Sequence, residues 1–206
     1  MIRSICWLLA IAALSGCALS GRPAAPPMST FVLEGTAQPS AVTSPATNLV
    51  LKVSMPAAAP AYSSSRMAYV EQPYRIDYFA RNEWADAPAR MLRTLLTQQL
   101  TNSGLFAFVV ADAAGVDENV RLDCEIIELV QAFSDSGSEI RLAIRFDLVD
   151  VAHRSIIVSR TISVTEGASA REPYAGVVAA NRAVQRALDQ LVALLHDPVM
   201  ALARRD

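Results

Sequence analysis

The chain has 206 residues, of which 52% are hydrophobic and 18% charged, and its formal net charge is −2. This length fits one globular domain with an appendage. Nucleic-acid binding is not expected, because phosphate contacts need clustered basic side chains and Lys52 is the only lysine. No stretch reaches the roughly 18–20 apolar residues that a transmembrane helix needs, so any membrane attachment requires another chemistry.

Residues 1–16 have the parts of a secretory signal peptide: a positive start at Arg3, an apolar run over 5–14, and small residues after it. The tetrad Leu14-Ser15-Gly16-Cys17 resembles a bacterial lipobox. In a lipobox the cysteine sulfur receives a diacylglycerol, the chain is cut before that cysteine, and the new amino terminus is acylated with a fatty acid such as palmitate. We therefore predict lipidation at Cys17. The alternative is an ordinary signal peptide cleaved near Gly16 or Ala18.

A lipidated cysteine predicts anchoring to the membrane without spanning it, since each buried methylene contributes about 0.8 kcal/mol. Ala18 and Leu19 follow the cysteine, where lipoproteins retained at the inner membrane often carry an aspartate. We therefore expect the outer membrane, with the domain in the periplasm. Residues 17–30 are rich in Pro, Ala and Ser and are predicted to form a tether.

The cysteine count leaves one free thiol in the mature chain. Cys6 leaves with the signal peptide and Cys17 is consumed as a thioether, so Cys124 has no disulfide partner. Cys124 lies in a run of alternating apolar and polar residues, which indicates a small buried side chain and not a nucleophile.

The predicted domain, 31–198, begins with short strands separated by loops. The expected strands are 31–33 and 48–53, followed after a loop over 55–65 by a hairpin of 67–70 and 74–79 with Pro73 in its turn.

The first helix is predicted to begin near Pro88, with Asp86 as its N-cap. Gly104 is predicted to end it. The helical spacing places one set of apolar residues on a single face: Met91, Leu92, Leu95, Leu96 and Leu100.

A short strand over 106–110 precedes three long strands. The clearest alternation runs from Val120, and the adjacent Ile126 and Ile127 shift its phase, which indicates a bulge. Turns near 134–138 and 151–154 separate it from two further alternating runs. We expect an antiparallel meander with one solvated face, on which Asp123 and Glu125 lie.

The last helix is predicted to begin at Pro173 and to stop at Pro198, with 199–206 as a frayed tail. The fold class that follows is α+β: a single domain with a mostly antiparallel sheet and two helices packed on one face.

Catalytic and metal-binding patterns are absent from the sequence. The two histidines, His153 and His196, are isolated, and no spacing typical of a zinc site, a nucleophile elbow or a phosphate loop occurs. The sequence predicts no enzyme activity, no metal and no cofactor.

The segment from Tyr74 to Trp84 is unusually rich in aromatic side chains interleaved with charges. One interpretation is a set of core aromatics under the first helix. The other is a contact surface, because amphipathic rings and arginine are favoured as interface anchors.

In this segment the chain resembles the ABC-type transport auxiliary lipoprotein family, to which paraquat-inducible protein C belongs. The resemblance covers about residues 30–196, and Trp84 lies in its most specific part. One departure is Glu83, where the family commonly has a basic residue. The resembling features are the lipobox at Cys17, 31–33, the strand 49–56 ending in proline, 66–69, 78–88, 102–106, the meander and the final helix.

The resemblance implies a non-catalytic lipoprotein that works with an inner-membrane ABC transporter and a substrate-binding protein of the mammalian-cell-entry type. Such systems move lipids or other hydrophobic compounds between membranes. A ring-shaped partner would favour a homo-oligomer. We expect contacts from Arg66, Tyr78, Arg81 and Trp84. The alternative is a lipid-binding chaperone that carries an acyl chain between its helices and its sheet.

Overall fold

A computed structural model describes residues 27–35, 44–111, 115 and 117–205 of the chain. The predicted signal peptide, the lipidation site Cys17 and most of the predicted tether lie outside these residues. No helix in the described part of the chain is long and apolar enough to cross a membrane.

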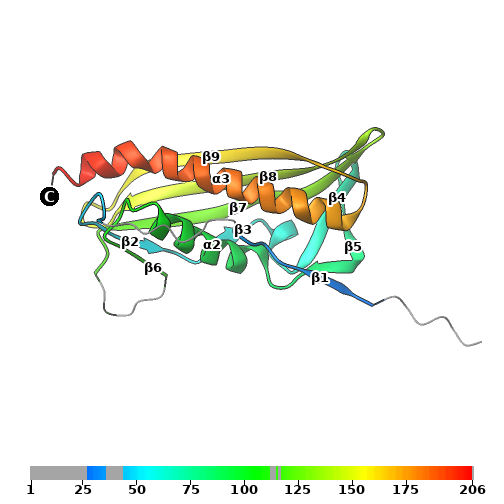
Figure 1. Cartoon of the computed structure of the whole chain (residues 1–206), viewed down its shortest axis with the longest axis horizontal. Coiled ribbons are helices and arrows are strands. Elements are labelled where there is room, and N and C mark those ends of the chain that lie inside the picture. Colours follow the sequence, from blue (N-terminus) through cyan, green and yellow to red (C-terminus); the bar gives the residue numbers. More distant parts are fainter. Residues whose placement is uncertain (1–26, 36–43, 112–114, 116, 206) are drawn as a thin grey trace, which may run out of the picture.

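The described residues form one sheet of nine strands and two α-helices (Figure 1). The strands are β1 (Ser29–Phe31), β2 (Val50–Val53), β3 (Ala57–Ala58), β4 (Arg66–Gln72), β5 (Arg75–Trp84), β6 (Phe108–Val110), β7 (Val120–Ser134), β8 (Gly137–Asp150) and β9 (Ser155–Ala168). The helices are α2 (Pro88–Asn102) and α3 (Pro173–Leu202), and a 3₁₀ turn covers Pro60–Tyr62.

The long strands β7, β8 and β9 form the predicted antiparallel meander. The bulge predicted at Ile126 and Ile127 is confirmed, because the register of β7 against β8 shifts between Ile126 and Glu128. The other edge of β7 is covered by three short parallel strands in succession. β2 pairs with its start, β3 with its middle and β4 with its end. The longest ladders are thus antiparallel, while the short pairings beside them are mostly parallel.

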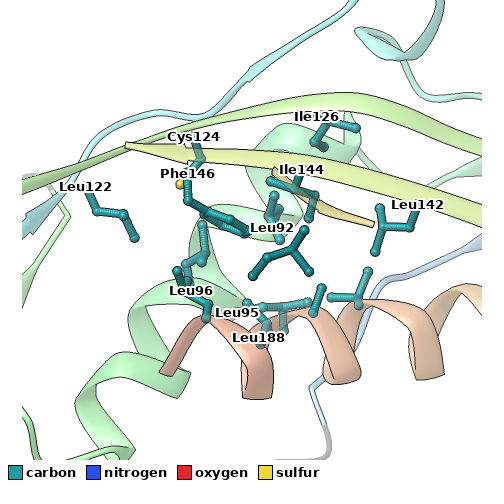
Figure 2. Packing of buried hydrophobic residues seen from close by; sticks show 14 of the residues in the cluster. Leu92, Leu95, Leu96, Leu122, Cys124, Ile126, Leu142, Ile144, Phe146 and Leu188 are labelled. Atoms are coloured by element: carbon teal, nitrogen blue, oxygen red, sulfur yellow. The ribbon is translucent and has the colours of Figure 1, made fainter. Parts of the chain in front are cut away.

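Both helices lie on one face of the sheet, as predicted (Figure 1). The predicted apolar face of α2 is buried at Leu92, Leu96 and Leu100, and Figure 2 shows Leu92 and Leu96 near Phe146 and Ile144 of β8. The opposite face of the meander is solvated and carries paired charges: Arg145 contacts Glu125 at 2.8 Å and Asp147 at 3.5 Å. The α+β prediction is therefore confirmed.

The predicted N-cap of α2 is wrong by one residue. Ala87 occupies the N-cap position, with an extended ψ of 132°, and no side chain caps the helix. Pro88 at the first helical position explains the difference, because it disfavours helical conformation in the residue before it. Asp86 instead accepts a hydrogen bond from its neighbour's N–H, Ala87 N, at 2.7 Å, and pairs with Arg90.

The predicted stop at Pro198 is also wrong, and so is the frayed tail from 199. The helix α3 continues through Pro198 to Leu202, and Val199 and Leu202 are buried. A proline inside a helix removes one backbone hydrogen bond, here the bond to the carbonyl of Leu194. The burial of the two apolar side chains offsets that loss.

Four short elements differ from the prediction. β1 begins at Ser29, inside the predicted tether, and ends at Phe31, before the predicted strand 31–33 ends. The strand expected over 106–110 is reduced to Phe108–Val110. The predicted loop 55–65 contains β3 and the 3₁₀ turn.

Candidate partner-contact surface

The aromatic segment forms most of the β4–β5 hairpin, which the sequence predicts around Pro73. Tyr74 occupies the turn with a φ of +67°, and its side chain is fully exposed. Between the pairs Ala68–Tyr78 and Arg66–Glu83, β4 advances two residues while β5 advances five. The three extra residues bulge out of β5, and such irregularities turn side chains away from the regular pleat.

Two of the four predicted contact residues lie against each other on this hairpin. The guanidinium carbon of Arg66 lies 3.6 Å from the ring centroid of Tyr78, a cation–π contact. The Tyr78 hydroxyl donates a hydrogen bond to the carbonyl of Ala61, in the 3₁₀ turn, at 3.1 Å. These contacts hold the exposed Arg66 in a fixed position.

Arg81 lies in the bulge of β5, and its side chain is exposed. Among the residues that the structure describes, no carboxylate pairs with it. Its charge is therefore available to a group outside the domain.

Trp84 does not belong to this surface. Its side chain is 4% exposed and packs in the core, and its residue pairs with Phe31 of β1. The expectation that Trp84 contacts a partner is thus wrong for this conformation, and the alternative of a core aromatic holds. The cause is its position at the end of β5, where the backbone N–H bonds to the carbonyl of Ser65 at 2.8 Å and the strand turns into α2.

Phe79 of the same segment joins a cluster that the sequence does not reveal. Its ring centroid lies 4.6 Å from that of Tyr69 and 6.3 Å from that of Phe133, at the end of β7. Arg171, in the link between β9 and α3, lies over the ring of Phe133 at 5.3 Å. Parallel pairing of β4 with β7 brings these rings together, and no local periodicity predicts that pairing.

The free thiol and the two histidines of the described residues lie apart from this surface. Burial, and secondarily the charges of Asp123 and Asp147, raise the pKa of the Cys124 thiol far above its ordinary range, which favours the protonated thiol over the reactive thiolate. His153 contacts Asp150 at 2.8 Å in the β8–β9 turn, and His196 contacts Asp197 at 2.9 Å on an exposed helix end. No three metal-ligating side chains of the described segments are grouped to hold an ion.

A hollow of about 500 Å³ lies along α3, next to Glu166 of β9. Under the start of α3, by contrast, the interface with the sheet is closely packed. A hollow lined by residues such as Met67, Trp84, Gln131 and Gly176 has a volume of about 10 Å³. That volume is about enough for a single water molecule.

The chain was compared with protein families and with curated proteins. The family described as "ABC-type transport auxiliary lipoprotein component" matches residues 31–193. A search of curated proteins finds no match.

Solved structures share the fold at low sequence identity. The protein XCC0632 from Xanthomonas campestris is 18% identical, with a TM-score of 0.76 over 85% of this chain and 99% of that chain. An uncharacterized protein is 13% identical, with a TM-score of 0.68 over 82% and 99% of the two chains. The hypothetical protein CT253 from Chlamydia trachomatis is 11% identical, with a TM-score of 0.51 over 75% and 99%. At these identities the likeness shows the fold alone.

Proposed function

The chain belongs to the ABC-type transport auxiliary lipoprotein family, and from this membership we propose that it is a non-catalytic component of an intermembrane lipid transport system. The observation that carries the proposal is the extent of the family match, which covers nearly all of the described domain. In this proposal the acylated Cys17 holds the domain at the outer membrane, and the domain docks a substrate-binding protein of the mammalian-cell-entry type.

The contact surface that we propose for this partner consists of Arg66, Tyr78 and Arg81. Arg66 is held over a ring and Arg81 has no carboxylate partner in the described part of the chain, so both present charge to a docking protein. Arginine and tyrosine are enriched among the residues that dominate binding energies.

Co-purification from detergent-solubilised membranes tests the proposal. Wild type is expected to recover a mammalian-cell-entry protein, identified by mass spectrometry, and Cys17→Ser to lose it together with the membrane fraction. Arg81→Glu should weaken recovery while the chain stays in the membrane. The matched control is Arg160→Glu, which changes an exposed arginine of β9 and should have no effect.

The lipid carrier is the alternative outcome of the same experiment. It requires an acyl-sized cavity between helices and sheet. The hollow under the start of α3 is close to the size of one water, and the hollow of about 500 Å³ along α3 is lined mostly by polar and charged residues. Recovery of bound lipid without a protein partner would overturn the docking proposal and favour the carrier.

The oligomeric state is tested separately. A single peak at the monomer mass in light scattering would exclude the homo-oligomer that a ring-shaped partner favours.

A further inference from the structure

The end of the molecule from which the chain leads back towards Cys17 carries a group of exposed apolar side chains. We call it the tether end and define it by the β4–β5 turn, the β7–β8 turn, the β9–α3 link and the start of β1, which all lie at one end of the long axis in Figure 1. Two contacts support this arrangement: Arg171 in the link donates to the carbonyl of Gly137 at 3.4 Å, and Ser138 Oγ donates to the carbonyl of Ala170 at 3.0 Å.

The apolar side chains at this end are large and point away from the core. Tyr74 is fully exposed in its turn, Ile76 is 42% exposed, and Tyr174 in the first turn of α3 is 61% exposed. Met28, beside the first described residue, is 55% exposed. Tyrosine rings of this kind favour the boundary between water and lipid, because one end of the ring is apolar and the other is polar.

The tether length limits how far this end can lie from a membrane. Ten peptide units separate Cys17 from Pro27, and even a fully extended chain spans at most about 3.6 Å per residue, or about 36 Å. The long axis is at least as long as β7, whose fifteen residues extend for about 50 Å at 3.4 Å per residue. A chain anchored at Cys17 therefore keeps the tether end within about 36 Å of the bilayer, and an upright molecule holds its opposite end farther away by the length of the long axis.

Charge does not dominate this surface. Arg75 is paired with Asp77 at 2.7 Å, Arg171 lies over Phe133, and Asp135 and Glu172 are exposed nearby. With both signs present, attraction to anionic lipids is weak, and the exposed rings and aliphatic groups decide the contact.

We propose that the tether end rests on the lipid surface to which Cys17 is anchored, with Tyr74, Ile76 and Tyr174 in the headgroup layer. The domain then stands upright, and the end that carries β6 and the β8–β9 turn faces the periplasm. This inference rests on lipidation at Cys17, which is part of the proposed function.

A pair of dye-labelled variants tests the orientation. The only other thiol, Cys124, is buried with a raised pKa and does not compete for labelling. The full lipidated chain carries a polarity-sensitive dye either at Ser169→Cys, in the β9–α3 link, or at Ser155→Cys, at the start of β9. Each protein is inserted into vesicles of phosphatidylethanolamine and phosphatidylglycerol at 3:1 that contain spin-labelled lipid. The dye at 169 should be quenched severalfold more than the dye at 155.

A substitution then tests which side chains make the contact. Tyr74→Asp together with Ile76→Asp should lower quenching at 169 to the level seen at 155; aspartate tolerates the positive φ of this turn. The matched control is Phe108→Asp in β6, an exposed apolar residue at the opposite end, which should leave the signal unchanged.

The possible failures are distinguishable. A chain that does not float with the vesicles overturns the lipid anchor, and with it the proposed function. A chain that floats but shows equal quenching at both positions overturns the orientation alone. If Tyr74→Asp with Ile76→Asp does not fold, the comparison of the two dyes in the unsubstituted chain still decides.

Discussion

Trp84 is expected from the sequence to contact a partner protein, but in the structure it belongs to the core. Its side chain is 4% exposed, so Trp84→Ala leaves a cavity and removes a large buried area. We expect a loss of about 3–5 kcal/mol in the free energy of unfolding, measured by chemical denaturation. Tyr78→Ala, at a half-buried position of the same strand, should cost less. Equal losses from the two substitutions would contradict this assignment.

Gly176 allows α3 to approach β7 closely. A Cβ built at this position would collide with Gln131 Oε1. Gln131 is 2% exposed and donates to Ser138 Oγ at 2.9 Å and to the carbonyl of Glu172 at 3.1 Å, so its side chain moves only if these bonds break.

Gly176→Ala is therefore expected to destabilise the domain by about 1–2 kcal/mol, although alanine is the better helix former by about 1 kcal/mol. Thermal and chemical unfolding measure the change. The double variant Gly176→Ala with Gln131→Ala should show favourable coupling between the two sites. A stabilising effect of Gly176→Ala alone would contradict the close approach.

The β8–β9 turn has a pH-sensitive contact. Asp150 accepts hydrogen bonds from His153, one from the backbone N–H at 3.0 Å and one from Nδ1 at 2.8 Å. These bonds, the backbone bond first, hold the pKa of the Asp150 carboxyl below its ordinary value. A carboxyl whose pKa is lower in the folded state stabilises the fold above about pH 4, its unfolded value, and loses this contribution as the pH falls through the folded value.

Asp150→Asn should therefore destabilise the chain at pH 7 and have a smaller effect at pH 3. Denaturant unfolding of wild type and variant at both pH values measures this difference. The control is Asp197→Asn, whose side chain is 97% exposed and should matter little at either pH. An effect of Asp150→Asn that is the same at pH 3 and pH 7 would show that the turn contact contributes no charge-dependent stability.

At the scale of elements, the end of α3 decides where the domain stops. Val199 and Leu202 are buried beyond Pro198. A chain shortened after Asp197 should lose several kcal/mol of stability, since each fully buried aliphatic side chain contributes about 1.5–3 kcal/mol. A chain shortened after Ala203 removes only residues outside the helix and is the matched control. Equal melting temperatures for both shortened chains would support the frayed tail that the sequence suggests.

Local sequence patterns predict best those helices and strands in which the pattern repeats over many residues. Alternation over 120–126 and helical spacing over 88–102 are each set by residues close in sequence, so the start of β7 and nearly all of α2 are predicted. The short strands β1 and β3 are not, because their pairing partners lie far along the chain. The end of α3 is predicted wrongly for a related reason. The low helix propensity of Pro198 predicts that the helix ends there, whereas contacts with the rest of the fold extend the helix to Leu202.

The candidate contact surface is likewise only partly predictable from the sequence. The sequence identifies the aromatic segment, and the structure brings Arg66 and Tyr78 together. Whether a ring of that segment faces the core or the solvent depends on the bulge in β5 and on the strand β1 beside it, neither of which has a local signal. Residue type thus predicts the region, and tertiary pairing decides which of its members are exposed.

At the scale of the whole molecule, the segment that follows β1 is fixed to α3 by Asn181. Its Oδ1 accepts from the backbone N–H of Glu34 at 2.6 Å, and its Nδ2 donates to the carbonyl of Val32 at 3.2 Å. Between these two residues, Leu33 is buried. Just after them, a Cβ on Gly35 would lie 3.2 Å from Leu95 of α2. A pull on the tether therefore reaches the sheet first, through the pairing of β1 with β5, and reaches α3 next, through the contacts of Asn181.

Asn181→Ala should release residues 32–34 from α3 while the sheet and its core remain folded. Hydrogen exchange is expected to rise at the N–H of Glu34, with little change in β7 and β8, because a side chain that bonds an edge segment contributes to local and not to global stability. Asn181→Asp keeps the acceptor for Glu34 and loses the donor to Val32, so it should protect Glu34 more than alanine does. If exchange rises equally in β7 and β8, the segment is part of the global folding unit, and the anchor is coupled directly to the core.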